Sequence, residues 1–435
     1  MSTDIFADGF KAEPYWWDAA KPAATLASPL PEATDVAIIG SGYAGLSAAL
    51  ELARHGTAVT VLEAENLGWG ASSRNGGMVS GGVNVGKGRA MNDDATRAML
   101  AEASQAYAHL EGIVAREKIE CFYQRVGRFV GAHTPGAFEA QSRRVEALNR
   151  IAESEAYMVP RERQHEEIAS DFYYGGMVVQ RAGGVHPALL HKGLLEAAYR
   201  AGATLCAGTR VGKVEGAPGA FRVQTSQGEV RAKEVVVASN GYTGDATPWQ
   251  QRRVIPIASF IIATEELGAE TVRALFPKLR MISETKRVLC YYRPSPDGKR
   301  IIFGGRARFR QATPQESAPT LHRFLCDRFP QLDGRGLKIT HAWTGNVAFT
   351  FDKLPHMGRQ DGLHYALGCN GSGVVMMTHL GHRTALNILG HANSPSAYEA
   401  LPMPTVPLYG GNPWFLPIVG GYYKMRDWID RRRAG

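Results

Sequence analysis

The sequence predicts a mixed α/β protein in which a domain built on a parallel sheet is interleaved with a domain rich in antiparallel strands. Three observations predict it. Near the N-terminus a short apolar strand runs into a glycine-rich turn, a helix and a second apolar strand (residues 35–62). Residues 254–304 are rich in strand patterns, with a hairpin signal at Asp297-Gly298. Helical spacing then returns at residues 374–389, so the two kinds of pattern alternate along the chain.

The glycine-rich turn after the first strand has the G-x-G-x-x-G spacing. Its first glycine allows the tight turn, its second lets the backbone approach a pyrophosphate, and its third lets helix and strand pack closely. The second strand ends on an acid that can accept hydrogen bonds from a ribose diol, which disfavours NADP and leaves NAD and FAD open. The order predicts a Rossmann-like FAD/NAD(P)-binding domain. Its candidate contacts are Gly40, Ser41, Gly42, Tyr43, Ala44, Gly45, Glu63 and Ala64.

Composition excludes several other classes of protein. The chain has 435 residues, 44% of them hydrophobic, a net charge of +8 and a pI near 9.2. Its basic residues are scattered, except for the run 431–433, so we expect no nucleic-acid partner. Five cysteines lie far apart without metal-ligand spacing, which predicts reduced, buried thiols, no metal and a cytoplasmic location. No signal peptide and no apolar run of transmembrane length is expected.

The pattern along the chain predicts the following division. An N-terminal arm (1–33) precedes a nucleotide-binding domain made of three segments (34–92, 175–250 and 337–395). A substrate domain is inserted twice (93–174 and 251–336), and a C-terminal tail follows (396–435). The last long helix is expected at Val374–Leu389. The basic and aromatic tail is expected to pack on the body, with contact to a membrane surface as the alternative.

Several further blocks carry a family resemblance. The segment from Gly68 to Gly77 reads G-W-G-A-S-S-R-N-G-G, and residues 343–346, 354–358 and 368–374 supply W-T-G-N, L-P-H-M-G and G-C-N-G-S-G-V. Shorter matches lie at residues 184–187, 237–241 and 302–305. In order and spacing these blocks resemble the D-amino-acid-oxidase-type FAD-dependent oxidoreductases, particularly the gamma-glutamylputrescine oxidase-like amine oxidases.

The resemblance implies FAD as the cofactor. No His or Cys occurs between Gly68 and Gly88, and Val347-Ala348 stands where one covalent subgroup has a Cys, so the flavin is expected to be noncovalent. Two positions depart from relatives: Ser73 replaces a frequent Gly, and Ser372 replaces a frequent His, which puts any His-assisted step in doubt. The further implied contacts are Gly70, Ala71, Ser72, Ser73, Arg74, Asn75, Gly76, Gly77, Met78, Val211, Asn240, Gly241, Gly371, Ser372, Gly373, Val374 and Val375.

The implied activity is oxidation of a C–N bond in a small amine, as in polyamine catabolism. Hydride would pass to flavin N5, the imine would hydrolyse, and O₂ would accept the electrons to give H₂O₂. Oxidase and dehydrogenase behaviour both stay open, because the Gly304-Gly305-Arg306 neighbourhood has no Lys. The alternatives are oxidation of a D- or N-methyl amino acid, as in sarcosine or glycine oxidase, and a non-amine electron-transfer flavoprotein. The catalytic residues are unknown from sequence; the candidates are Tyr291, Trp343, Arg306 and His356. Phe260, Tyr292 and Phe349 are further candidates to line the flavin face, and either Arg306 or Arg308 could pair with a substrate carboxylate. The oligomeric state is left open.

Overall fold

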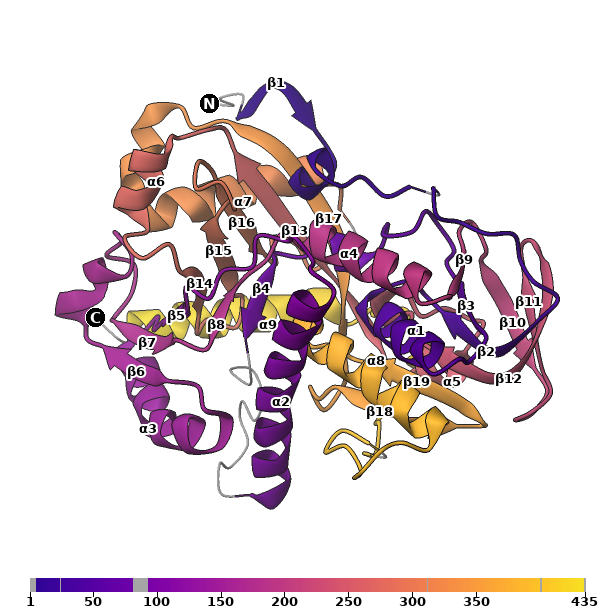
Figure 1. The fold of residues 1–435 in the computed structure, drawn as a ribbon. Helices are drawn as coiled ribbons and strands as arrows, with labels where there is room; N and C mark the ends of the chain where they lie inside the picture. The colour runs from indigo at the N-terminus through magenta and orange to yellow at the C-terminus, as the bar shows by residue number, and fades with distance from the viewer. Residues whose placement is uncertain (1–4, 24, 81–92, 311, 400, 434–435) are drawn as a thin grey trace.

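The fold is taken from a computed structural model, which describes residues 5–23, 25–80, 93–310, 312–399 and 401–433. Within these residues two large mixed sheets form the centre of the molecule (Figure 1). The helices α1, α4 and α8 lie with one sheet on the right of the view, and α6 and α7 lie with the other on the left. A small two-stranded sheet pairs β4 (Met78–Ser80) with β8 (Ala182–Gly184). This arrangement confirms the mixed α/β class.

The eight-stranded sheet of the described residues has a parallel centre. β12, β2, β3 and β9 pair in parallel in that order, β10 and β11 extend the sheet in antiparallel fashion, and β19 pairs with the end of β12. Its strands are β2 (Ala33–Ile39), β3 (Val59–Leu62), β9 (Thr204–Cys206), β10 (Val211–Glu215), β11 (Phe221–Thr225), β12 (Gly228–Val237), β18 (His356–Gln360) and β19 (Leu363–Leu367).

Helix α1 (Tyr43–Arg54) connects β2 to β3 and completes the predicted βαβ unit. It shares one apolar core with α2 (Asp94–Arg116), α4 (Pro187–Arg200) and α8 (Gly373–Leu389). The contact between α1 and α8 is close, since a Cβ added at Gly381 would lie 2.1 Å from the carbonyl oxygen of Ala44. Two helices that begin at predicted cofactor residues are therefore packed directly against each other.

The nine-stranded sheet is mostly antiparallel and runs β1-β17-β13-β16-β15-β14-β5-β7-β6 within the described residues. Helices α6 (Ala269–Leu275) and α7 (Pro314–Arg328) share an apolar core with it, while α3 (Pro135–Ala152) lies near its β6 edge. Its strands are β1 (Phe6–Lys11), β5 (Arg128–Gly131), β6 (Ala156–Val159), β7 (Gly176–Val179), β13 (Ile255–Thr264), β14 (Met281–Glu284), β15 (Cys290–Pro294), β16 (Ile301–Gly305) and β17 (Ile339–Phe349).

Two strand placements differ from the predicted segments. β7 and β17 belong to the nine-stranded sheet, although the segments 175–250 and 337–395 were predicted for the nucleotide-binding domain. β17 pairs with β13 along nearly its whole length, and only after residue 355 does the chain enter the other sheet at β18. The predicted N-terminal arm also contributes a strand, because β1 pairs with β17. The division into domains itself stays a prediction.

The predicted helix Val374–Leu389 is present as α8 (Gly373–Leu389), but the expectation that it is the last long helix is wrong. A further helix, α9 (Leu416–Arg432), forms part of the predicted C-terminal tail. A short helix α5 (Pro248–Gln251) also precedes β13. Among the helices of the described residues, none has the length and apolar character needed to cross a bilayer. All five cysteines are buried and unpaired, as predicted.

Candidate functional site

The turn after β2 places the three predicted glycines at the N-terminus of α1. Gly40 has φ +104°, which an L side chain rarely adopts. A Cβ added at Gly45 would lie 2.0 Å from the carbonyl oxygen of Gly40, so only glycine allows this approach of helix to turn. Gly42 is the N-cap of α1. Because glycine has no side chain, this residue cannot cap the N–H groups in the first turn of the helix with a side-chain oxygen.

Glu63 follows β3 and faces this turn. Its carboxylate accepts hydrogen bonds from the backbone N–H (3.0 Å) and the hydroxyl (2.6 Å) of Ser41, and from the N–H of Glu65 (3.1 Å). The acid therefore lies at the carboxyl edge of the parallel strands, where a ribose would need it. Val211, at the start of β10, packs against the apolar cluster that contains Leu62 and so lies on the same side of the sheet as the end of β3.

The loop of residues 70–78 lies against the N-terminus of α1. The hydroxyl oxygen of Ser72 accepts a hydrogen bond from the N–H of Tyr43 (3.0 Å). The side chain of Asn75 holds the loop closed, because its amide donates to the carbonyl of Ser72 (2.9 Å) and its oxygen accepts from the N–H of Gly77 (2.8 Å). Two glycine-rich segments that are separate in sequence thus meet at one helix end.

A third glycine-rich segment begins α8. Gly371 has φ +89° and is exposed, with open space where a side chain would be. Ser372, the N-cap of α8, makes no side-chain cap hydrogen bond, so the positive end of this helix is not capped by its own N-cap residue. The preceding strand end is tied to the predicted residue Asn240, whose side-chain oxygen accepts from the N–H of Gly368 (3.0 Å). Its neighbour Gly241 packs against the backbone of Asn346.

Three tryptophan N–H groups hold three consecutive residues of the loop. They come from the N-terminal arm and from β17, which are far from the loop in sequence. The three pairs are Trp17 with the Ser73 hydroxyl (2.9 Å), Trp343 with the Arg74 carbonyl (2.7 Å) and Trp16 with the Asn75 carbonyl (2.9 Å). The guanidinium of Arg74 lies over the rings of Trp17 and Trp69, 4.6 and 4.3 Å from their centroids. The loop is therefore fixed from outside the nucleotide-binding unit.

Residues 35–386 match the protein-family model described as FAD dependent oxidoreductase. The chain belongs to this family. It is also 32% identical over 403 residues to gamma-glutamylputrescine oxidoreductase of Escherichia coli (strain K12), an alignment that covers 90% of this chain and 92% of that protein.

Solved structures share the fold of this FAD-dependent oxidoreductase. L-proline dehydrogenase from P. horikoshii has a TM-score of 0.71 at 20% identity, with 84% of this chain and 96% of that chain covered. Glycine oxidase from Geobacillus kaustophilus has a TM-score of 0.70 at 21% identity, with 87% and 99% covered. FAD is accordingly the cofactor of the family to which the chain belongs.

The observed geometry fits this cofactor. Two helix N-termini without side-chain caps from their own N-cap residues suit the negative pyrophosphate and the electron-rich end of a flavin. Gly40 and Gly45 leave no room for side chains, and Gly371 is open, so backbone can approach a ligand at both ends. FAD would be held by the predicted residues at 40–45, 63–64, 70–78, 240–241 and 371–375.

Of the four catalytic candidates, Tyr291 and Arg306 lie together beside the loop. The Tyr291 ring fills the space above Gly76 and Gly304, where an added Cβ would lie 2.8 and 2.5 Å from it. Its hydroxyl bonds to Ser259 (2.9 Å), and burial raises its pKa to about 12, so the hydroxyl is protonated at neutral pH. The Arg306 guanidinium lies 4.5 Å from the Phe349 ring centroid, and burial lowers its pKa.

Trp343 and His356 lie elsewhere. Trp343 is 1% exposed and uses its N–H to hold Arg74, so it supports the loop and has no surface for a substrate. His356 is fully buried after the Leu354-Pro355 turn and pairs with Asp352 at 3.1 Å. Tyr292 and Phe260 belong to the apolar core shared with α7. Successive residues of a strand face opposite sides of the sheet, so Tyr292 faces away from the side that Tyr291 faces.

Two supports of the site were missed from sequence. Arg293 is 1% exposed, and its guanidinium donates to the carbonyls of Gly77 (3.1 Å) and Val185 (2.7 Å). Trp16 and Trp17, which hold Asn75 and Ser73 of the loop, are the second support. The available signal was a tryptophan pair in a polar, proline-rich segment, which indicates burial but not the partner.

We expect Trp17→Phe to weaken FAD binding. The substitution keeps a ring beneath Arg74 but removes the N–H that holds Ser73. A net hydrogen bond of about 0.5–1.5 kcal/mol corresponds to a dissociation constant raised roughly two- to tenfold, measurable by FAD titration of the apoprotein. Trp69→Phe is the matched control, because Trp69 also stacks on Arg74 but its N–H bonds to no described residue. Equal constants for both variants would contradict the role given to the Trp17 N–H.

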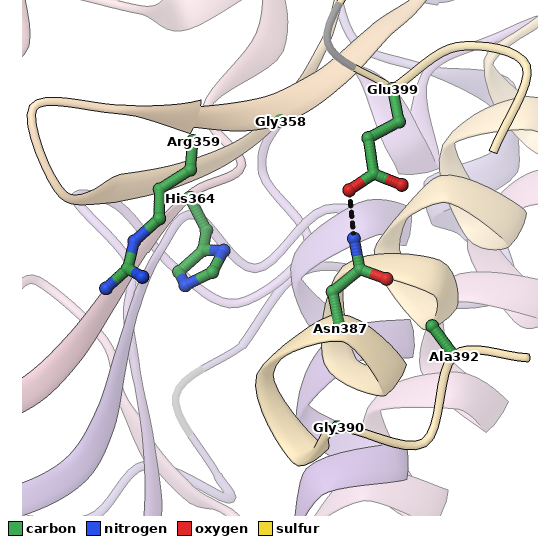
Figure 2. Close-up of a pocket in the computed structure, with 7 residues that line it drawn as sticks. All are labelled: Gly358, Arg359, His364, Asn387, Gly390, Ala392 and Glu399. Carbon is green, nitrogen blue, oxygen red and sulfur yellow. Dashed lines mark hydrogen bonds between the residues drawn. The ribbon is translucent and has the colours of Figure 1, made fainter. Parts of the chain in front are cut away.

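A separate pocket of about 330 Å³ lies at the other end of α8 (Figure 2). It is formed by the β18–β19 hairpin, the end of α8 and the segment after it. Its lining residues are Gly358, Arg359, His364, Asn387, Gly390, Ala392 and Glu399. Because α8 has 17 residues, about 25 Å separates this end from the N-terminus of the helix, so the pocket is not part of the flavin site.

Proposed function

We propose that this FAD-dependent oxidoreductase oxidises a C–N bond of a small amine that carries a carboxylate away from the reacting carbon, as a γ-glutamyl diamine does. The observation that carries the proposal is Arg306. Arg306 is partly buried, and no carboxylate of the described residues lies within ion-pair distance of its guanidinium. Taking a cation out of water without a carboxylate partner is costly, and a bidentate carboxylate of a ligand would compensate for this cost.

The position of Arg306 supports this assignment. It follows β16 directly, on the sheet whose Tyr291 touches the loop at Gly76. A substrate whose carboxylate met Arg306 would extend past Tyr291 toward that loop. The gamma-glutamylputrescine oxidoreductase to which the chain is similar acts, by its name, on a molecule of this charge pattern.

Tyr291 would orient the substrate without acting as a base. Its hydroxyl is protonated at neutral pH and is held by Ser259, so it can donate a hydrogen bond but does not take up a proton. The substrate amine must therefore reach the site as the neutral base, because only a nitrogen lone pair stabilises the forming iminium. Bound FAD would supply the electron acceptor for the hydride. The final acceptor is then O₂ or another oxidant.

A D- or N-methyl amino acid is the second candidate substrate, since its α-carboxylate could also meet Arg306. The two readings differ in the distance between carboxylate and reacting carbon, which is short in an α-amino acid and long in a γ-glutamyl diamine. A non-amine electron-transfer flavoprotein would need no such cation. The noncovalent flavin and the cytoplasmic location expected from the sequence belong to the same proposal.

A substrate panel tests the proposal. The purified holoenzyme is mixed under anaerobic conditions with diamines, γ-glutamyl diamines, N-methyl amino acids and D-amino acids, and loss of the visible flavin absorption is followed. We expect γ-glutamyl diamines to bleach the flavin fastest. Faster bleaching by an α-amino acid would select the second candidate, and no bleaching by any amine would contradict the amine function. Admitting air afterwards and measuring H₂O₂ distinguishes O₂ from other acceptors.

Arg306→Met is expected to raise KM for carboxylate-bearing amines. Hydrogen bonds to charged groups contribute about 1.5–3 kcal/mol, which corresponds to a rise of roughly ten- to a hundredfold. The parent diamine, which has no carboxylate, should react equally with both forms. Arg308→Met is the matched control, because the Arg308 guanidinium donates to the backbone of Glu316 (3.1 Å) instead of being unpaired. An equal rise in KM for the carboxylate-bearing amine and for the parent diamine would mean that Arg306 does not bind the carboxylate.

A further inference from the structure

The exposed large hydrophobic side chains gather at the C-terminal end of the chain. Of the eleven in the described part, seven lie between residues 406 and 428. They are Val406, Leu408, Trp414, Ile418, Tyr422, Met425 and Trp428. Soluble surfaces scatter such residues singly, whereas a contiguous apolar group marks an interaction site.

The exposed apolar residues that belong to α9 form one stripe along the helix. Ile418, Tyr422 and Met425 follow one another at spacings of four and three, so they share a face of the helix, and they are 71%, 51% and 50% exposed. The opposite face is fixed to the body. Gly420 packs on the ring of Phe309, and Asp427 accepts hydrogen bonds from backbone N–H groups that precede β15. In Figure 1 the helix, drawn in yellow, runs along the nine-stranded sheet. The apolar stripe therefore points away from the protein.

The acidic side chains of α9 face the body, and the last two basic side chains face outward. Its acids, Asp427 and Asp430, both pair with the Arg287 guanidinium, at 3.1 and 2.6 Å, and so face the body. Three of its basic side chains have partners: Arg426 pairs with Asp430 at 4.0 Å, and Lys424 and Arg431 lie over rings of the body, 5.8 Å from the Phe309 centroid and 4.4 Å from the Phe172 centroid. Arg432 and Arg433 are exposed at the end of the stripe. The guanidinium of Arg432 lies 4.0 Å from the ring centroid of Trp428, which is itself 54% exposed. The outward surface thus combines apolar and aromatic side chains with the positive charge of Arg432 and Arg433, which pair with no carboxylate of the described residues.

We infer that the outer face of α9 docks on an anionic lipid surface, with the helix lying in the plane of the interface. An apolar stripe that includes a Tyr and ends beside an exposed Trp and exposed Arg side chains has the composition of an interfacial helix. Each basic side chain near such a surface adds attraction, and the net charge of +8 acts in the same direction. A second copy of the chain is a poorer occupant, because a two-fold contact through this face would bring the same cations together. The inference does not depend on the identity of the amine.

Vesicle co-sedimentation of the full-length holoenzyme tests the inference. We expect the protein to sediment with phosphatidylglycerol-containing vesicles, to stay in solution with pure phosphatidylcholine vesicles, and to be released by high salt. Ile418→Ser combined with Tyr422→Ser and Met425→Ser should lower the partition coefficient by more than about tenfold, because the apolar stripe supplies the insertion. Tyr199→Ser, an exposed aromatic on α4 (47% exposed), should leave it unchanged.

Charge reversal supplies a second, independent variant. Arg432→Glu with Arg433→Glu changes only exposed side chains and should also lower binding by more than about tenfold. Arg143→Glu with Arg150→Glu, on exposed positions of α3, is the matched control. Retained FAD and an unchanged unfolding midpoint show that each variant is folded. Wild-type protein that ignores anionic vesicles would overturn the inference, as would a dimer in solution that the serine variants dissociate.

Discussion

Gly45→Val is expected to yield a protein that folds but does not retain FAD. The new Cβ would lie 2.0 Å from the carbonyl oxygen of Gly40 and 3.2 Å from Ile38. The first contact is with backbone, so the turn itself must move. Overpacking of this kind costs about 1–3 kcal/mol in stability. Its larger effect is on the N–H groups at the start of α1, which lose the position that a pyrophosphate needs.

We expect an FAD dissociation constant raised by at least about a hundredfold, since the ligand loses several backbone contacts at once. Gly112→Val is the matched control. Gly112 lies on the exposed side of α2, nothing lies within 4 Å of its added Cβ, and valine and glycine differ little in a helix. Equilibrium titration of apoprotein with FAD measures both variants. FAD binding by the Gly45 variant as tight as in the wild type would contradict the assigned role of the turn.

Arg328→Met is expected to destabilise the protein strongly. The side chains of Arg328 and Glu284 are 1% and 0% exposed within the core of the nine-stranded sheet. The Arg328 Nη2 donates to both carboxylate oxygens (2.8 and 2.7 Å), and Nε donates to one of them (3.2 Å). The Tyr173 hydroxyl adds a hydrogen bond to the same carboxylate (3.1 Å). Removing the guanidinium leaves a buried carboxylate without its counter-charge, which costs about 3–5 kcal/mol. Urea unfolding followed by circular dichroism measures the change.

The size of this effect depends on burial and not on the presence of an ion pair. Arg163 makes an equally good bidentate pair with Glu166, at 2.7 and 2.9 Å, but on the surface. Arg163→Met is therefore expected to change the free energy of unfolding by no more than about 1 kcal/mol. Adding Glu284→Gln to Arg328→Met should restore part of the loss. Similar effects of the Arg328 and Arg163 substitutions would refute the explanation.

The parts of the fold that the sequence predicted correctly depend on short-range patterns. The β2–α1–β3 unit is one example, because its strands, glycines and acid lie within 30 residues and each has a local physical reason. The Asp297-Gly298 hairpin between β15 and β16 is another. The FAD family followed from several such local blocks in a fixed order.

Long-range pairing could not be predicted in the same way. Nothing in the pattern of β17 indicates that it pairs with β13, about 80 residues away, or that the arm strand β1 completes that edge. The three tryptophans that hold the loop reach it from residues 16, 17 and 343. Whether Tyr291 or Tyr292 lies beside the loop depends on which face of β15 meets the loop. The sequence of β15 does not decide this, because a strand that is buried on both faces shows no alternation of polar and apolar residues.

Helix α9 was missed because its two faces are reversed from the usual pattern. Its buried positions are Gly420 and Asp427, which interact through close packing and hydrogen bonds, and its apolar residues point outward. Sequence periodicity assigns the apolar face to the core. The tail was expected to pack on the body. The structure shows that α9 is attached through the face with Gly420 and Asp427, and that the face with Ile418, Tyr422 and Met425 is exposed.

The central claim is that glycine-rich segments at the N-termini of α1 and α8, together with the loop at residues 70–78, hold one noncovalent FAD. The most direct measurement is to denature the purified protein, pass it through a filter that retains the polypeptide, and quantify FAD in the filtrate. We predict one FAD per chain, all of it in the filtrate. A correctly folded protein that is colourless and takes up no added FAD would contradict the claim, and flavin retained with the denatured polypeptide would contradict its noncovalent attachment.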